Sequence, residues 1–80
     1  MNIYDYNGRK NICGEKIRML RIKHHWSQNK LANELQLKGI IIGRDSINRI
    51  EKGTRFVADY ELKILAEVFD IPIYDLFNNK

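Results

Sequence analysis

The stretch 44–52 carries side chains that could recognise the edges of nucleic-acid bases. If it is helical, its two isoleucines, Ile47 and Ile50, point to one side at 100° per residue, and the other residues form a contiguous outward face. Arginine can bond guanine through two parallel hydrogen bonds, asparagine can do the same with adenine, and aspartate can accept from cytosine. The side chains of these types are Arg44, Asp45, Asn48 and Arg49, followed by Lys52.

A second interpretation of this polar face remains open, because any short surface helix is polar on its outer side. The distribution of charge does not decide between the two. Residues 1–58 contain 12 Lys and Arg against 5 Asp and Glu, whereas residues 59–80 contain 2 against 5. A basic region is typical of a protein that binds a phosphate-bearing partner, and it is equally compatible with a solvated surface.

Helical spacing recurs at four places before a short last turn, and no strand-like alternation persists, so the chain is predicted to be all-α with five helices. We expect Asn11 to cap a first helix that runs to about residue 25, and Ser27 to cap the second. Gly53 favours a left-handed end for the third helix, and Asp59 is the expected cap of the fourth. The expected core residues are Cys13, Ile17, Leu20, Leu31, Ala32, Leu35, Ile47, Ile50, Leu62, Leu65, Ala66 and Phe69. His24 lies on the same face as the first three and is expected at the boundary, with its ring packed on the core and its polar edge in water.

The 80 residues are enough for one domain. Residues 1–10 are expected to form a flexible N-terminal arm, either frayed or ordered on a partner, and residues 11–80 the domain itself. The longest aliphatic run, residues 40–42, is far shorter than the roughly 18 residues of a membrane span. Residues 1–10 contain no apolar stretch resembling a signal peptide, so we expect a cytoplasmic protein.

Chemistry beyond binding is not indicated by the sequence. Adjacent helical residues His24 and His25 point about 100° apart, and Cys13 lies roughly 16 Å along the axis from His24, so they cannot share a metal ion. Neither a glycine-rich phosphate loop nor a His-Glu-x-x-His pattern occurs. We expect no metal site, no cofactor and no enzymatic activity.

Four stretches taken together resemble the phage-repressor-like (Cro/XRE-type) helix-turn-helix family. They are Ile-Arg-Met-Leu-Arg at 17–21, Ser-Gln-Asn-Lys-Leu-Ala at 27–32, Ile-Asn-Arg-Ile-Glu-Lys-Gly at 47–53 and the amphipathic stretch 62–69. The resemblance extends from Cys13 to Phe77. It implies a five-helix, lambda-repressor-like DNA-binding domain whose second and third helices form the helix-turn-helix, with the third helix in the major groove of double-stranded DNA.

The resemblance also implies a role for individual residues. Base reading falls to residues of the third helix, which are Arg44, Asp45, Asn48 and Arg49. Phosphate contacts fall at the start of the second helix and after the third, where free N–H groups and cations favour anions. These contacts are assigned to Ser27, Gln28, Lys52, Thr54 and Arg55. Arg21 and Glu51 match positions that form a partly buried ion pair between the first and third helices.

Two features depart from the family pattern. The connection at residues 38–43 is longer than the usual turn of about 3 to 4 residues, so the register of the third helix on DNA is left open. We expect one or two of its isoleucines to enter the core and Gly43 to stand at the N-cap. The second departure is Asp45, an acid on a face that would approach phosphates. It would lower non-specific affinity and favour cytosine, and it is equally an argument against tight DNA binding.

These observations predict a small bacterial or phage-derived transcriptional regulator, a repressor that binds its operator sequence-specifically as a homodimer. The expected dimer surface is the apolar group Ile71, Ile73, Tyr74 and Phe77, and the alternative role of these residues is to cap the core. The competing interpretation is an antitoxin or accessory protein-interaction module that uses the same fold to bind another protein. RNA binding is the least favoured, because no stacking aromatic residues lie among the basic ones.

Overall fold

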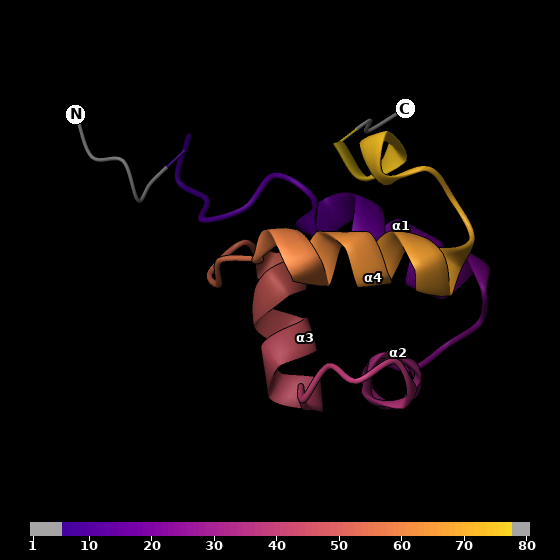
Figure 1. Cartoon of the computed structure of the whole chain (residues 1–80). Coiled ribbons are helices and arrows are strands. Elements are labelled where there is room, and N and C mark those ends of the chain that lie inside the picture. Colours follow the sequence, from indigo (N-terminus) through magenta and orange to yellow (C-terminus); the bar gives the residue numbers. More distant parts are fainter. Residues whose placement is uncertain (1–5, 78–80) are drawn as a thin grey trace.

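The computed structural model describes residues 6–77, which form a bundle of helices (Figure 1). The order is α1 (Gly14–Lys23), α2 (Gln28–Leu37), α3 (Arg44–Lys52), α4 (Asp59–Phe69) and the 3-10 helix η1 (Ile73–Phe77). Within residues 6–77 there is no β-strand, and the pairing of extended backbone is an isolated bridge between Tyr6 and Arg9. The prediction of an all-α fold is confirmed, with a 3-10 turn as the fifth helix.

One hydrophobic core joins all five elements. Every element contributes side chains that are almost completely buried: Ile17, Leu31, Leu35, Ile47, Ile50, Leu65 and Leu76. His24 was expected at the boundary of this core, and it is exposed at the end of α1. Its ring packs on the edge of the core, with its centroid 4.8 Å from that of Trp26 and 5.5 Å from that of Phe69.

Two predicted helix boundaries are wrong by a few residues. Helix α1 begins at Gly14 and ends at Lys23, because His25 has a φ of 60° and the backbone there has left the helical region. The Asn11 side chain still makes a cap-like bond, since its Oδ1 accepts from the Gly14 N–H at 2.8 Å. Helix α4 has Ala58 as its N-cap in place of Asp59, and the Glu61 carboxylate accepts from the Ala58 N–H at 2.9 Å.

The caps of the helix-turn-helix agree with expectation. Ser27 Oγ accepts from the Lys30 N–H at 3.0 Å at the start of α2. Gly43 is the N-cap of α3, and Gly53 ends that helix with a left-handed φ of 81°. These local signals depend on a few consecutive residues, which is why the sequence alone identifies them.

The long connection between α2 and α3 is attached to the core at its end. Ile42 is buried and Ile40 partly buried, while Ile41 between them is 100% exposed. The Gln36 side chain donates to the Ile42 carbonyl at 2.7 Å and fixes the backbone just before α3. The expectation that one or two isoleucines enter the core is met.

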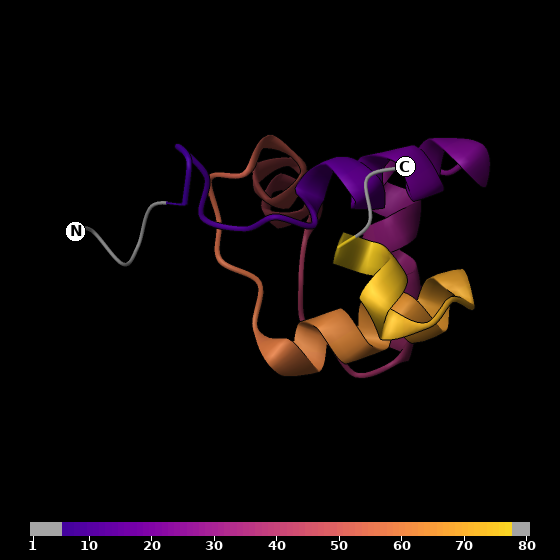
Figure 2. The ribbon, with the colours of Figure 1, turned by 90° about the horizontal axis from the view of Figure 1, so that it is seen from above.

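The helices cross one another in a way that leaves α3 at the edge of the molecule. In Figure 1, α3 runs across the direction of α4, and α2 is seen end-on beside it. Figure 2 looks down on the end of α3 and shows the N-terminal segment passing next to it. Among residues 6–77, no helix combines the length and the apolar character that crossing a membrane requires.

Candidate nucleic-acid interface

Helix α3 has a narrow buried side and a broad outward one. Ile47 and Ile50 are almost completely buried, and Glu51 is the third buried residue of the helix. The side chains expected to read bases lie on the opposite side, where Arg44, Asp45 and Arg49 are exposed and Asn48 is half-buried, with Lys52 also exposed. The structure therefore brings the predicted base-reading residues together on one helix face.

The first two residues of this face interact with each other. Arg44 Nη2 lies 3.4 Å from Asp45 Oδ1, and the two side chains are 61% and 82% exposed. A pair this open to water contributes little to stability. It does place an anion beside a cation at the start of α3, so the local positive charge is reduced there.

The buried acid of α3 is held by an arginine from α1. Arg21 Nε donates to Glu51 Oε2 at 2.6 Å and Arg21 Nη2 donates to Glu51 Oε1 at 3.0 Å, a two-bond arrangement. Arg21 Nη1 also donates to the Trp26 carbonyl at 2.8 Å. The hydrogen bond to Glu51 raises the pKa of Arg21 above its ordinary value. This pair fixes α3 relative to α1.

Gln28, expected to bind phosphate, points its side chain toward α3. Its Nε2 donates to Asn48 Oδ1 at 3.3 Å and to Glu51 Oε1 at 3.2 Å. The amide therefore links the start of α2 to both the buried ion pair and the outward face. Ser27 beside it is exposed and caps α2. What the start of α2 offers an anion is its backbone N–H groups and the positive end of the helix dipole.

The residues expected to bind phosphate after α3 behave differently from one another. Lys52 is exposed, and the Thr54 hydroxyl donates to the Arg49 carbonyl at 3.3 Å. Arg55 turns away, because its guanidinium makes two bonds to the Glu61 carboxylate, 3.1 and 3.0 Å long. This hydrogen bonding raises the pKa of Arg55 and lowers the pKa of Glu61. The Arg55 cation is thus paired with a carboxylate of α4.

Residues 9–11, which we call the N-terminal clasp, were not identified as part of the site from the sequence. The Lys10 N–H donates to the Gly53 carbonyl at 2.7 Å, and Asn11 Nδ2 donates to the carbonyls of Ile50 and Arg55 at 3.0 and 2.8 Å. In the sequence, this segment is marked by the basic pair at 9–10 and by Asn11 as a helix cap, and neither indicates a contact with α3. Such contacts between residues about 40 positions apart leave no periodic pattern.

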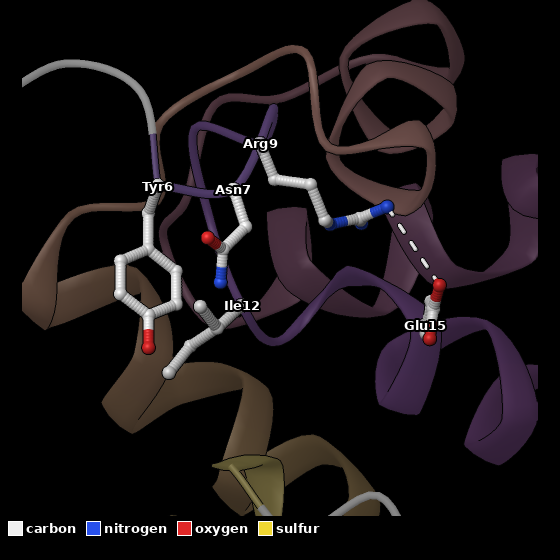
Figure 3. Close-up of a pocket in the computed structure, with 5 residues that line it drawn as sticks. All are labelled: Tyr6, Asn7, Arg9, Ile12 and Glu15. Carbon is white, nitrogen blue, oxygen red and sulfur yellow. Dashed lines mark ion pairs between the residues drawn. The ribbon is translucent and has the colours of Figure 1, made fainter.

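Arg9 extends from the clasp toward α1, as Figure 3 shows, with its guanidinium 3.8 Å from Glu15. Its Nη2 also donates to the Glu51 carbonyl at 3.3 Å. A small pocket beside it is lined by Tyr6, Asn7, Arg9, Ile12 and Glu15. The guanidinium therefore lies among groups of the protein itself, between the start of α1 and the end of α3.

The side chains that could bind a metal ion in the described part of the chain are those of His, Cys, Asp and Glu. Residues 6–77 contain no group of three or more His, Cys, Asp or Glu side chains arranged to hold one. The Cys13 thiol is buried, and burial raises its pKa to about 11, so it is protonated at neutral pH. Only the thiolate form of cysteine is a good metal ligand.

Comparison with known proteins agrees with this geometry. A helix-turn-helix family model matches residues 17–76, which include the whole of α2 and α3 and both partners of the Arg21–Glu51 pair. No curated protein and no solved structure matches the chain significantly. The match extends over most of the chain and across every helix that forms the core. The chain therefore belongs to the helix-turn-helix family of DNA-binding regulators.

Proposed function

We propose that this protein is a sequence-specific transcriptional regulator that binds double-stranded DNA by inserting the outward face of α3 into the major groove. The observation that carries the proposal is the division of α3 into two sides. One side is fixed in the core by Ile47, Ile50 and the Arg21–Glu51 pair, and the other exposes hydrogen-bonding groups. A rigid helix with such a face suits base recognition, since the groups reach the groove without reorganising.

The proposed base-reading roles follow from the chemistry of each side chain. Arg44 and Arg49 suit guanine, where a guanidinium can bond O6 and N7 together. Asn48 suits adenine, and Gln28 orients its amide by donating to Oδ1. Asp45 suits the amino group of cytosine and disfavours contact with phosphate. The base readers are thus Arg44, Asp45, Asn48 and Arg49.

Phosphate contacts are proposed at both ends of the helix-turn-helix. At the start of α2, the backbone N–H groups near Ser27 and Gln28 would face one phosphate. After α3, Lys52 and Thr54 would face another. Arg55 lies at the edge of this second group, with its guanidinium shared with Glu61. Such contacts set the position of the domain on the duplex without reading its sequence.

We further propose that the regulator is a cytoplasmic repressor that acts as a homodimer. Two domains are needed for useful specificity, and they would bind half-sites about one helical turn apart. The proposed contact surface is on and before η1, where Ile73, Tyr74 and Phe77 are exposed and Ile71 is partly buried. Pairing would remove these apolar side chains from water, and occupancy of the operator would block transcription.

A second candidate function is supported by the same apolar residues. Tyr74 is 69% exposed and lies beside the exposed Ile73. A surface of this kind fits a different protein as well as a second copy of this chain. The alternative is therefore an antitoxin or accessory protein-interaction module, in which the partner protein occupies η1 and DNA binding is secondary.

The experiment that tests the proposed function is selection of bound sites from a random double-stranded DNA library at physiological salt. We expect enrichment of an inverted repeat with half-sites about one turn apart. On that site, Arg49→Ala and Arg44→Ala should each cost about 1 to 3 kcal/mol of binding and relax the preference at one position. Lys63→Ala, which removes an exposed cation from α4, should leave the base preference unchanged.

Other outcomes of the selection are equally informative. A single enriched half-site would contradict the homodimer and leave base reading in place. A flat pool from folded protein would overturn sequence-specific binding, and the partner-binding alternative would replace it. Indifference of binding to both arginine substitutions would also contradict the proposed role of α3.

A further inference from the structure

We propose that Lys10 binds a DNA phosphate, and that the N-terminal clasp places it beside Lys52 and Thr54 for this purpose. The inference rests on the proposed function and extends its interface to a segment outside the helix-turn-helix. It assigns the contact to an ammonium group of the N-terminal segment. The observations that carry it are the backbone attachment of the clasp, the exposure of Lys10 and the neutralisation of Arg55.

The backbone of Lys10 is fixed at the end of α3. Its N–H donates to the Gly53 carbonyl at 2.7 Å, so the two peptide groups lie in direct contact. Gly53 is the residue between Lys52 and Thr54, which are two of the proposed phosphate contacts. The backbone of Lys10 therefore lies next to the backbone between Lys52 and Thr54, although Lys10 is more than 40 positions away in sequence.

The residues on either side of Lys10 hold this attachment. The Asn11 amide donates to the carbonyls of Ile50 and Arg55. Arg9 lies flat over Gly53, where an added Cβ would come within 2.5 Å of the Arg9 Cζ atom. The Ile50 carbonyl also accepts from the Gly53 N–H at 3.0 Å, so the Asn11 amide adds a second bond to it at the end of α3. The clasp is thus held on both sides of Lys10.

The ammonium group of Lys10 lies over the loop that follows α3, at Phe56. Its Nζ lies 5.1 Å from the centroid of the Phe56 ring, a cation–π distance, and both side chains are exposed. Among residues 6–77, no carboxylate lies within ion-pair distance of Lys10. The positive charge therefore faces solvent beside the end of α3.

Two other cations near this end, Arg55 and Arg9, are already engaged with groups of the protein. Arg55 bonds Glu61 through both terminal nitrogens, and Arg9 faces Glu15 and backbone carbonyls (Figure 3). Besides Arg49, which is assigned to base reading, Lys52 and Lys10 are exposed cations placed to meet an incoming phosphate here. An ammonium suits this role because it is a compact charge that needs no fixed donor direction.

The test is the salt dependence of binding, measured on the selected operator and on an unrelated duplex of equal length. Removing one phosphate contact reduces the slope of log K against log salt concentration by about 0.9. We expect this reduction for Lys10→Gln and for Lys52→Gln, with weakening by the same factor on both duplexes. Lys10→Arg should restore the slope. Lys63→Gln is the matched control, because it removes one exposed positive charge from α4.

The failure of this inference is distinguishable from failure of the proposed function. If Lys52→Gln lowers the slope while Lys10→Gln behaves like Lys63→Gln, Lys10 does not contact phosphate and the regulator still binds DNA. If the unmodified protein binds neither duplex, the proposed function is wrong and the inference falls with it. A loss on the operator alone would make Lys10 a base reader and would also overturn the phosphate role.

Discussion

The two ends of α3 differ in how they are held: the C-terminal end is buried and bonded to other elements, and the N-terminal end is exposed. At the C-terminal end, Glu51 has a side chain only 3% exposed and receives bonds from Arg21 and Gln28. The carbonyls there accept from Arg9 and Asn11. At the N-terminal end, the cap is Gly43, which supplies no side-chain bond, and the first two side chains of the helix are mostly exposed.

Under the proposed function, this difference separates the residues that stabilise the fold from those that recognise DNA along one helix. The buried end is held by charges and amides from α1, α2 and the N-terminal clasp, so a change there affects the whole fold. The open end is held by its backbone and by Ile47 in the core. Side chains such as Arg44 and Asp45 can therefore differ between proteins of this fold, and change the bound sequence, without a large cost in folding free energy.

Removing the buried acid should have the largest effect. Glu51→Ala leaves the Arg21 guanidinium, 13% exposed, without its carboxylate, and we expect the free energy of unfolding to fall by about 4 kcal/mol. Urea denaturation followed by circular dichroism measures this loss. Glu67→Ala on α4, an exposed acid, is the control and should change stability by less than about 0.5 kcal/mol. Equal effects of the two substitutions would contradict the anchoring role of Glu51.

The Asn11 amide is expected to make the next largest contribution to stability at the buried, C-terminal end of α3. Asn11→Asp keeps an oxygen for the Gly14 N–H but replaces the donor to Ile50 and Arg55 with a second acceptor. We expect a loss of about 2 kcal/mol, because both carbonyls lose the amide donor and face a carboxylate in its place. Thermal unfolding of Asn11→Asp and Asn11→Ser compares the two halves of the amide. If both variants have the same melting temperature as the unmodified protein, the clasp does not stabilise the position of α3.

These two residues also mark the limit of what the sequence predicts. The helices, the core and the caps at Ser27 and Gly53 follow from residues a few positions apart, so periodicity and cap chemistry are sufficient. The Arg21–Glu51 pair was expected only through the family resemblance. The bonds of Asn11 and the turning of Gln28 toward Glu51 join residues 23 to 44 positions apart, and no local pattern encodes them.

One residue predicted to bind phosphate, Arg55, shows that contacts between residues only a few positions apart can also escape prediction from the sequence. Arg55 and Glu61 are six positions apart across the loop into α4, and whether they meet depends on how that loop closes. In the connection at 38–43, the sequence indicates that isoleucines enter the core but not which ones. Ile42 is buried and Ile41 wholly exposed. The sequence could not predict this, because a loop has no repeating geometry that assigns a side to each residue.

Acidification should lower the free energy of unfolding by a smaller amount, through the pair that Arg55 in the loop after α3 forms with Glu61. The hydrogen bond from Arg55, with help from the Ala58 N–H, holds the pKa of Glu61 below its ordinary value of 4.5. The folded state therefore favours the ionised carboxylate, and this stabilisation is complete above pH 4.5 and is lost as the pH falls through the lowered pKa. We expect a contribution of about 1 kcal/mol.

Urea denaturation of the unmodified protein and of Glu61→Gln at a series of pH values tests this contribution. The two proteins should differ most above pH 4.5 and converge in more acidic solution. Glu67→Gln provides the control for removal of an acid from α4 outside the pair. A difference between Glu61→Gln and the unmodified protein that stays constant through the acid range would rule out titration of this carboxylate as the source.

The smallest effect on stability is expected at the open end, where Asp45 is 82% exposed. Asp45→Asn removes its charge while keeping its shape, and the free energy of unfolding should change by less than about 0.5 kcal/mol. DNA binding should change more, because the substitution removes an anion from a face that approaches phosphates and releases Arg44 from its pair. Affinity for an unrelated duplex should rise and the preference at one operator position should shift. Denaturation and competition binding measured on the same variant separate the two properties, and a loss of stability without a shift in preference would mean that this end of α3 also anchors the fold.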